Sequence, residues 1–152
     1  MTNRQLSSFL VAAKRATYAS VGEVGERTLP DGAKELVYEA GLFRYRDRYF
    51  GSNPFLGEEI VFHKSKPVWG MNYCGLVVSV RVESNDVYEF LRLCLQEVTV
   101  SKPFRGPRSL TRDDWKYRCS AQGNVEKFSG HEAILHRNRK VYDLLFHGGR
   151  IA

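Results

Sequence analysis

Apolar side chains recur at helical spacing in two segments of the chain. The first segment predicts a helix from about Asn3 to Thr17, and the second predicts a helix that Ser84 or Asn85 caps and that runs to about Val98. Each helix has one apolar face, which it must bury against another element. The apolar faces consist of Leu6, Phe9, Leu10 and Ala13 in the first helix, and of Val87, Phe90, Leu91, Cys94, Leu95 and Val98 in the second.

Alternating apolar and polar residues predict strands after each helix. Pro and Gly between Lys102 and Arg108 exclude regular structure there. Two-residue turns are expected at Ser65-Lys66 and at Asn138-Arg139, each joining two strands as a hairpin. The expected strands are residues 36–38, 43–49, 59–64, 67–74 and 115–119 and the two arms of the hairpin 132–147.

The segment 55–75 is similar to the segment 128–148 at a constant shift, with no gap. Six positions are identical, among them Glu59 and Glu132, and His63 and His136. Repeats of this kind indicate the architecture. We therefore predict an α+β fold that is internally duplicated: a helix plus a four-stranded antiparallel sheet, used twice about a pseudo-twofold axis. Residues 1–152 form a single domain, with repeat halves at about 1–80 and 82–152.

The expected turns decide which side chains share a face of each hairpin. With Ser65-Lys66 as the loop, Phe62 lies opposite Trp69, and in the second hairpin Leu135 lies opposite Tyr142. Trp69 and Tyr142 are then buried beneath the helices. The remaining polar residues lie on the face away from the helices, where a groove between the halves would bind a ligand. They are Glu59, His63 and Asn72 in the first half and Glu132 and His136 in the second.

The composition fits one globular domain: 152 residues, 43% of them hydrophobic. No apolar run approaches the roughly 20 residues of a membrane helix, and no signal peptide is recognisable. The three cysteines are far apart and predict free thiols in a reducing compartment. We expect a cytoplasmic protein with no membrane partner.

The net charge of +6 is uneven, because all of the excess lies in residues 102–152. Nucleic acid is one partner that such a distribution allows. The best candidates for contact with nucleic acid are the basic residues that alternate with aromatic ones in two expected strands: Arg44, Arg46 and Arg48, with Lys116 and Arg118. A solvated basic surface explains the same pattern.

Four sequence motifs resemble a bacterial family of unknown function. They are Tyr45-Arg46-Asp47-Arg48-Tyr49-Phe50-Gly51, Pro67-Val68-Trp69-Gly70-Met71-Asn72-Tyr73, Arg105-Gly106-Pro107-Arg108 and Phe146-His147-Gly148-Gly149-Arg150-Ile151. The resemblance implies a domain that stands alone or follows an Xre-type helix-turn-helix domain, and this sequence shows no DNA-binding segment in front. The doubled plan is also similar to gyrase-inhibitor-like effector-binding domains, which bind cationic or aromatic small molecules with the help of a glutamate.

These observations favour a small-molecule binding or sensing module of unknown ligand. A small hydrolase is an alternative, with Glu132 and His147 as a carboxylate–imidazole pair for general base catalysis. A nucleic-acid-associated accessory protein is another. We expect no cofactor and no metal site, because His131 and His136 fall on opposite faces of a strand.

Overall fold

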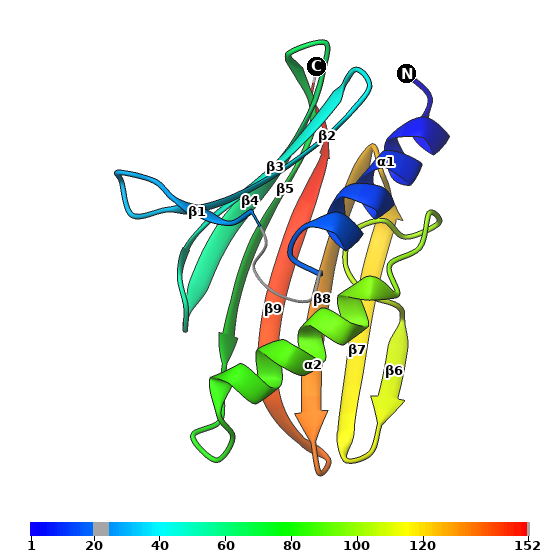
Figure 1. Cartoon of the computed structure of the whole chain (residues 1–152). Coiled ribbons are helices and arrows are strands. Elements are labelled where there is room, and N and C mark those ends of the chain that lie inside the picture. Colours follow the sequence, from blue (N-terminus) through cyan, green and yellow to red (C-terminus); the bar gives the residue numbers. More distant parts are fainter. Residues whose placement is uncertain (20–24, 152) are drawn as a thin grey trace.

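The computed structural model describes residues 1–19 and 25–151, and two helices lie on one face of a sheet (Figure 1). Helix α1 spans Asn3–Ala16 and begins with a capping box, in which Thr2 and Gln5 satisfy each other's backbone N–H groups. Helix α2 spans Ser84–Gln96. Its N-cap is Glu83 rather than the expected Ser84 or Asn85, and within the described residues no side chain caps it. Neither helix is long and apolar enough to cross a membrane.

The described residues form one sheet of nine strands in which all neighbours are antiparallel. The spatial order is β1-β2-β3-β4-β5-β9-β8-β7-β6. The strands are β1 (Arg27–Thr28), β2 (Lys34–Ala40), β3 (Phe43–Gly51), β4 (Phe55–His63), β5 (Lys66–Val77), β6 (Ser109–Arg112), β7 (Trp115–Asn124), β8 (Lys127–His136) and β9 (Arg139–Arg150).

The predicted fold class was therefore wrong in its central feature. The strands are not divided into two duplicated units of one helix and four strands, because β5 and β9 pair continuously from Trp69↔Arg150 to Val77↔Tyr142. Each of these strands would otherwise leave a row of unpaired backbone groups at a sheet edge. Pairing them satisfies both rows and makes one large sheet, which twists so that β2 and β3 run at an angle to β6–β9 (Figure 1).

Two β-bulges overturn the predicted faces of the hairpins. The turn residues are Lys64-Ser65 and Arg137-Asn138, and all four have positive φ. In each hairpin the register of the strand pairing shifts by one residue at a short distance from the turn. In the first hairpin the shift follows Val61, so that Val61, not Phe62, lies opposite Trp69. A one-residue shift of register moves every later side chain to the other face of the sheet. The acidic residues expected to face away from the helices thus lie beneath them.

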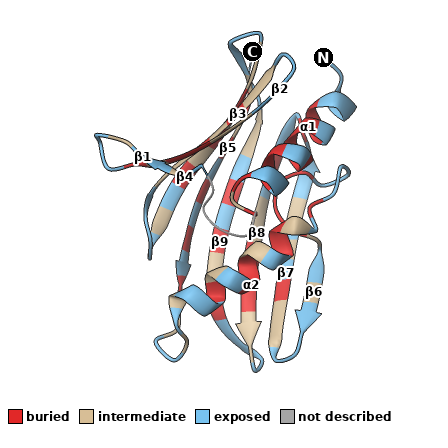
Figure 2. Ribbon diagram, in the orientation of Figure 1, coloured by how far each residue is buried: buried red, intermediate tan, exposed pale blue. Residues whose placement is uncertain are grey.

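The core lies between the helices and the sheet, where the buried residues gather (Figure 2). Trp69 and Tyr142 are both fully buried, which confirms their prediction as core residues. The loop before β6 also enters this layer, since Phe104 stacks on Phe128 with ring centroids 4.0 Å apart. This loop brings the neighbouring Arg105 beneath the helices, where it is 7% exposed.

Candidate functional site

Two glutamates lie in the buried layer between the helices and the sheet. Glu59 on β4 is 2% exposed and Glu132 on β8 is fully buried. Burial of a charged carboxylate is costly unless the charge is paired and hydrogen-bonded. The two residues meet this requirement in different ways.

Glu132 is held by four hydrogen bonds from three side chains. Arg105 donates from Nε to Oε2 at 3.1 Å and from Nη2 to Oε1 at 2.8 Å, which is a bidentate pair. The hydroxyl of Tyr117 donates to Oε2 at 2.5 Å, and that of Tyr142 donates to Oε1 at 3.1 Å. The Tyr117 oxygen also accepts from the backbone N–H of Gly106 at 2.9 Å. Both carboxylate oxygens are thus satisfied, and the cluster ties β8 to the loop that carries Arg105.

Among the described residues, the carboxylate of Glu59 has a single partner, the ammonium group of Lys14 on α1. Burial lowers the pKa of Lys14, although the neighbouring Glu59 carboxylate raises it in part. Lys14 lies on the buried face of the helix, in place of the apolar residue that the helical pattern would lead one to expect. The ion pair joins α1 to the centre of the sheet.

Asp47 on β3 is a third buried acid, 4% exposed, and it lies beside Glu59 in the paired strand. Its Oδ1 accepts a hydrogen bond of 2.6 Å from the hydroxyl of Tyr73. Burial, followed by the charge of Glu59, raises the pKa of Asp47 to about 7. Asp47 therefore gains or loses a proton near neutral pH, which an ordinary aspartate does not do.

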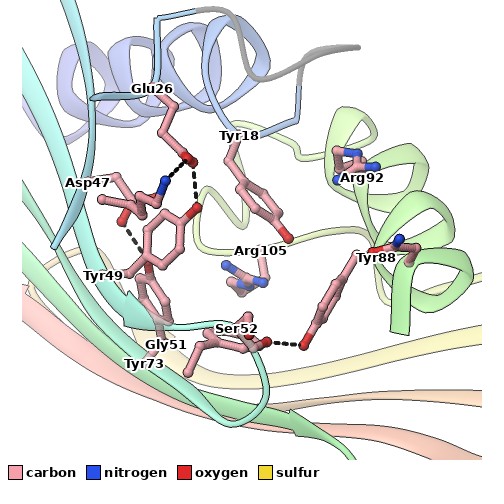
Figure 3. A pocket seen from close by; sticks show the side chains of 13 residues that line it. Tyr18, Glu26, Asp47, Tyr49, Gly51, Ser52, Tyr73, Tyr88, Arg92 and Arg105 are labelled. Atoms are coloured by element: carbon pink, nitrogen blue, oxygen red, sulfur yellow. Dashed lines mark hydrogen bonds and ion pairs between the residues drawn. The ribbon is translucent and has the colours of Figure 1, made fainter. Parts of the chain in front are cut away.

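Asp47 lies at the inner end of a cavity of about 300 Å³ between the sheet and the two helices (Figure 3). The rim includes Gly51, Ser52 and Asn85, which are exposed, so the cavity opens to solvent. The inner residues are buried. Tyrosine rings form much of the wall, and the guanidinium of Arg105 lies at the back (Figure 3). The complete lining is Tyr18, Glu26, Lys34, Asp47, Tyr49, Gly51, Ser52, Phe55, Tyr73, Asn85, Tyr88, Arg92 and Arg105.

A second, much smaller cavity of about 20 Å³ lies deeper. It shares Tyr18, Asp47 and Arg105 with the larger one and is also lined by Lys14 and Glu59. The Lys14–Glu59 pair therefore lies directly behind the cavity. Glu132 lines neither of these two cavities. It affects them only by fixing the position of Arg105, which lines both.

The structure does not assemble the remaining predicted ligand-binding residues into a site. Asn72 is exposed on the uncovered face of β5. His63 packs against Phe43, with ring centroids 4.8 Å apart, and His136 stacks on Trp115 at 4.3 Å. Of the five predicted residues, Glu59 lines the smaller of these two cavities and the other four line neither. Glu59 does so from the helix side rather than from a groove on the opposite face.

The predicted Glu132–His147 pair is also not formed. Glu132 pairs with Leu144, whereas His147 pairs with Ser129 and is exposed. The bulge after Ile134 puts the glutamate beneath the helices, so the two side chains lie on opposite faces of the sheet. Within the described residues, no group of three or more His, Cys, Asp or Glu side chains could hold a metal ion.

The basic residues of the uncovered face are partly neutralised by acids. Arg46 pairs with Glu58 at 2.8 Å, and Arg48 pairs with Glu35 at 2.9 Å. Arg46 also lies over the ring of Phe62, as does Arg44. These contacts account for the alternation of basic and aromatic residues without a nucleic acid.

Sequence reasoning missed Asp47 and Arg105, although both lie in the motifs that carry the family resemblance. A signal for Asp47 was present, because it alternates in phase with Tyr45 and Tyr49 and so occupies a position where the pattern expects an apolar residue. Arg105 gave no such signal. It lies in an irregular loop between Pro103 and Pro107, and no periodicity indicates where its side chain points.

A comparison with family models matches residues 47–151 to a domain of unknown function (DUF5680). The match begins at Asp47 and includes β4 to β9, α2 and the Arg105 loop. No curated protein and no solved structure matches the chain.

Proposed function

Because the chain belongs to the DUF5680 family, whose description assigns no activity, we propose from the geometry that it is a small-molecule binding module with its ligand in the cavity between sheet and helices. One observation supports this above all. Asp47 and Arg105 are buried, have hydrogen-bonding capacity that the described residues leave unused, and line a cavity that opens to solvent. Its volume of about 300 Å³ is at the lower end of the range of ligand sites. The ligand is accordingly small.

The walls favour a planar ligand. Tyr18, Tyr73 and Tyr88 reach the cavity from three separate parts of the chain. The Tyr88 ring is fixed at the rim by its hydroxyl, which donates to the carbonyl oxygen of Ser52. Aromatic side chains of this kind bind flat rings by stacking and edge contacts.

The resemblance to a bacterial family associated with Xre-type DNA-binding domains adds a biological setting to this proposal. A module of this kind would sense a metabolite for a transcription regulator, either in the same polypeptide or in a separate one. The cavity supports the first part of this proposal, the binding of a small molecule. The link to a DNA-binding partner rests on the family resemblance.

The test is a thermal-shift screen with small aromatic compounds of negative, zero and positive charge. A ligand at about 100 times its Kd stabilises the folded protein by about 2.7 kcal/mol, which is a readily measured rise in Tm. Asn85→Trp places an indole at the rim and should abolish the response to every hit. Glu89→Trp, one helical turn further on α2 and outside the cavity, should preserve it.

Hits that stabilise both tryptophan variants equally would place the binding site elsewhere. A screen in which no compound stabilises the wild type would contradict the proposed function.

A further inference from the structure

Hydrogen-bond donors with no partner among the described residues converge on the cavity. Arg105 uses Nε and Nη2 on Glu132, which leaves Nη1 free. The Tyr18 hydroxyl and the Arg92 guanidinium likewise have no hydrogen bond or ion pair within the described part of the chain, and both line the cavity. Each of these three unpaired groups is accessible to solvent. Polar groups in a binding site left unpaired by the protein indicate what a ligand must supply.

The charged side chains around the cavity also favour an anionic ligand. At the rim, Lys34 pairs with Glu26 at 3.4 Å, and at the back Arg105 is matched by Glu132. Among the described residues, Arg92 has no acidic partner. A cationic ligand would be repelled by Arg92, whereas an anionic ligand would be attracted by Arg92 and could also accept a hydrogen bond from Nη1 of Arg105.

We propose that the ligand is a small aromatic carboxylate, with its ring between the tyrosines and its carboxylate bound by Tyr18, Arg92 and Arg105. This inference rests on the proposed function and adds the charge and class of the ligand. A carboxylate has four acceptor positions on two oxygens, which suits several donors that converge from different elements.

Asp47 couples this binding to a proton. It faces Lys14 on α1, Glu59 on β4, Tyr73 on β5 and Arg105, with Arg92 and Tyr88 of α2 across the cavity. An ionised Asp47 would repel a second carboxylate, but a protonated Asp47 donates a hydrogen bond to it. Since the pKa of Asp47 in the free protein is about 7, the carboxylate binds with uptake of a proton above that pH.

The experiment is calorimetric titration with 2-naphthoate, 2-naphthamide and 2-naphthylmethylamine, which share one ring system and differ in charge. We expect 2-naphthoate to bind at least about tenfold more tightly than the other two, because it alone satisfies the free donors. Its Kd should rise about tenfold between pH 6 and pH 8. Heats measured in buffers of different ionisation enthalpy should show the uptake of a proton at pH 8.

Three variants separate the parts of this proposal. Arg92→Leu should weaken 2-naphthoate binding about tenfold or more, whereas Arg81→Leu, which removes the same charge before α2 and outside the cavity, should leave Kd unchanged. Asp47→Asn, which mimics the protonated acid, should bind 2-naphthoate with a Kd that no longer depends on pH.

Binding of the amide or the amine as tightly as 2-naphthoate would overturn the carboxylate inference and leave the cavity as a ligand site. Failure of all three compounds would also overturn it, and the wider thermal-shift screen would then decide the proposed function separately. A pH dependence that persists in Asp47→Asn would overturn the role of Asp47.

Discussion

The two buried glutamates of this sheet show how the same residue serves two purposes. Within the part of the chain that the structure describes, Glu132 receives four hydrogen bonds and lines neither cavity, whereas Glu59 has one ion pair and borders the deeper cavity. The partner of Glu132 is an arginine, which remains charged at any accessible pH, and the partner of Glu59 is a lysine, which can lose its proton. A second acid, Asp47, lies next to Glu59 and has no equivalent beside Glu132. The saturated cluster stabilises the fold, and the unsaturated one is free to respond to protons and ligands.

The largest effect should follow from Glu132→Gln. This change leaves the Arg105 charge buried without a carboxylate and should lower the free energy of unfolding by about 3–5 kcal/mol, as measured by urea denaturation. The loss should be similar at pH 6 and pH 9, because Arg105 cannot deprotonate. Glu58→Gln, which breaks the partly exposed pair with Arg46, serves as the control and should cost at most about 1 kcal/mol. Equal losses in the two variants would contradict the assignment of Glu132 as a structural centre.

Glu59→Gln should cost less, about 2–3 kcal/mol near neutral pH, because Lys14 can respond by losing its proton. Without the carboxylate, the pKa of Lys14 falls further below its ordinary value, so the folded state binds fewer protons than the unfolded state. Stability then rises with pH, and the difference from the wild type should shrink between pH 6 and pH 9. A penalty that does not change with pH would show that the two glutamates are equivalent after all.

Asp47→Asn should stabilise the protein at high pH. The pKa of Asp47 is raised from 3.8 to about 7, so the folded state holds a proton that the unfolded state releases. This contribution is complete below about pH 4 and is lost as the pH rises to about 7, and it amounts to about 2–4 kcal/mol.

The variant should therefore gain stability relative to the wild type as the pH rises from 4 to 8, as measured by urea denaturation at each pH. Asp113→Asn, at an exposed turn, should show no such trend. A constant difference between Asp47→Asn and the wild type would rule out proton release at this site.

The smallest effect is expected from Tyr73→Phe, with a loss of about 1 kcal/mol. The hydroxyl of Tyr73 donates to Asp47 and so lowers its pKa. Its removal should move the titration of Asp47 to higher pH, which NMR of the ¹³C-labelled carboxyl group would detect. Tyr142→Phe, which removes the corresponding hydrogen bond to Glu132, should leave the titration of Asp47 unchanged. A shift of the Asp47 titration to lower pH in Tyr73→Phe would contradict the role of this hydrogen bond.

The local structure was largely predictable from periodicity. The apolar stripe of the first helix predicted Asn3–Thr17 and the helix spans Asn3–Ala16, and the irregular stretch between Lys102 and Arg108 was also predicted. The faces of the sheet were not predictable to the same degree. In each hairpin a bulge adds one residue where two apolar side chains are adjacent, Val68-Trp69 and Val141-Tyr142, and either residue of such a pair can point inward.

The candidate site was predicted poorly because its residues come together only in the tertiary structure. Glu59 was identified, but on the wrong face. Asp47 and Arg105 meet only because an irregular loop passes beneath the helices. The joining of β5 to β9 is likewise a contact between distant segments that the strand pattern does not encode.

The β5–β9 pairing has a consequence for the order in which the chain folds during synthesis. β5 ends at Val77 and β9 begins at Arg139, so the ribosome completes β5 long before its neighbour on that side exists. Until β9 emerges, β5 is an open sheet edge able to pair with a strand of another nascent chain. Contacts of such long sequence separation also slow the final closure of the sheet. Association of nascent chains through this edge is therefore a hazard in the interval before β9 is made.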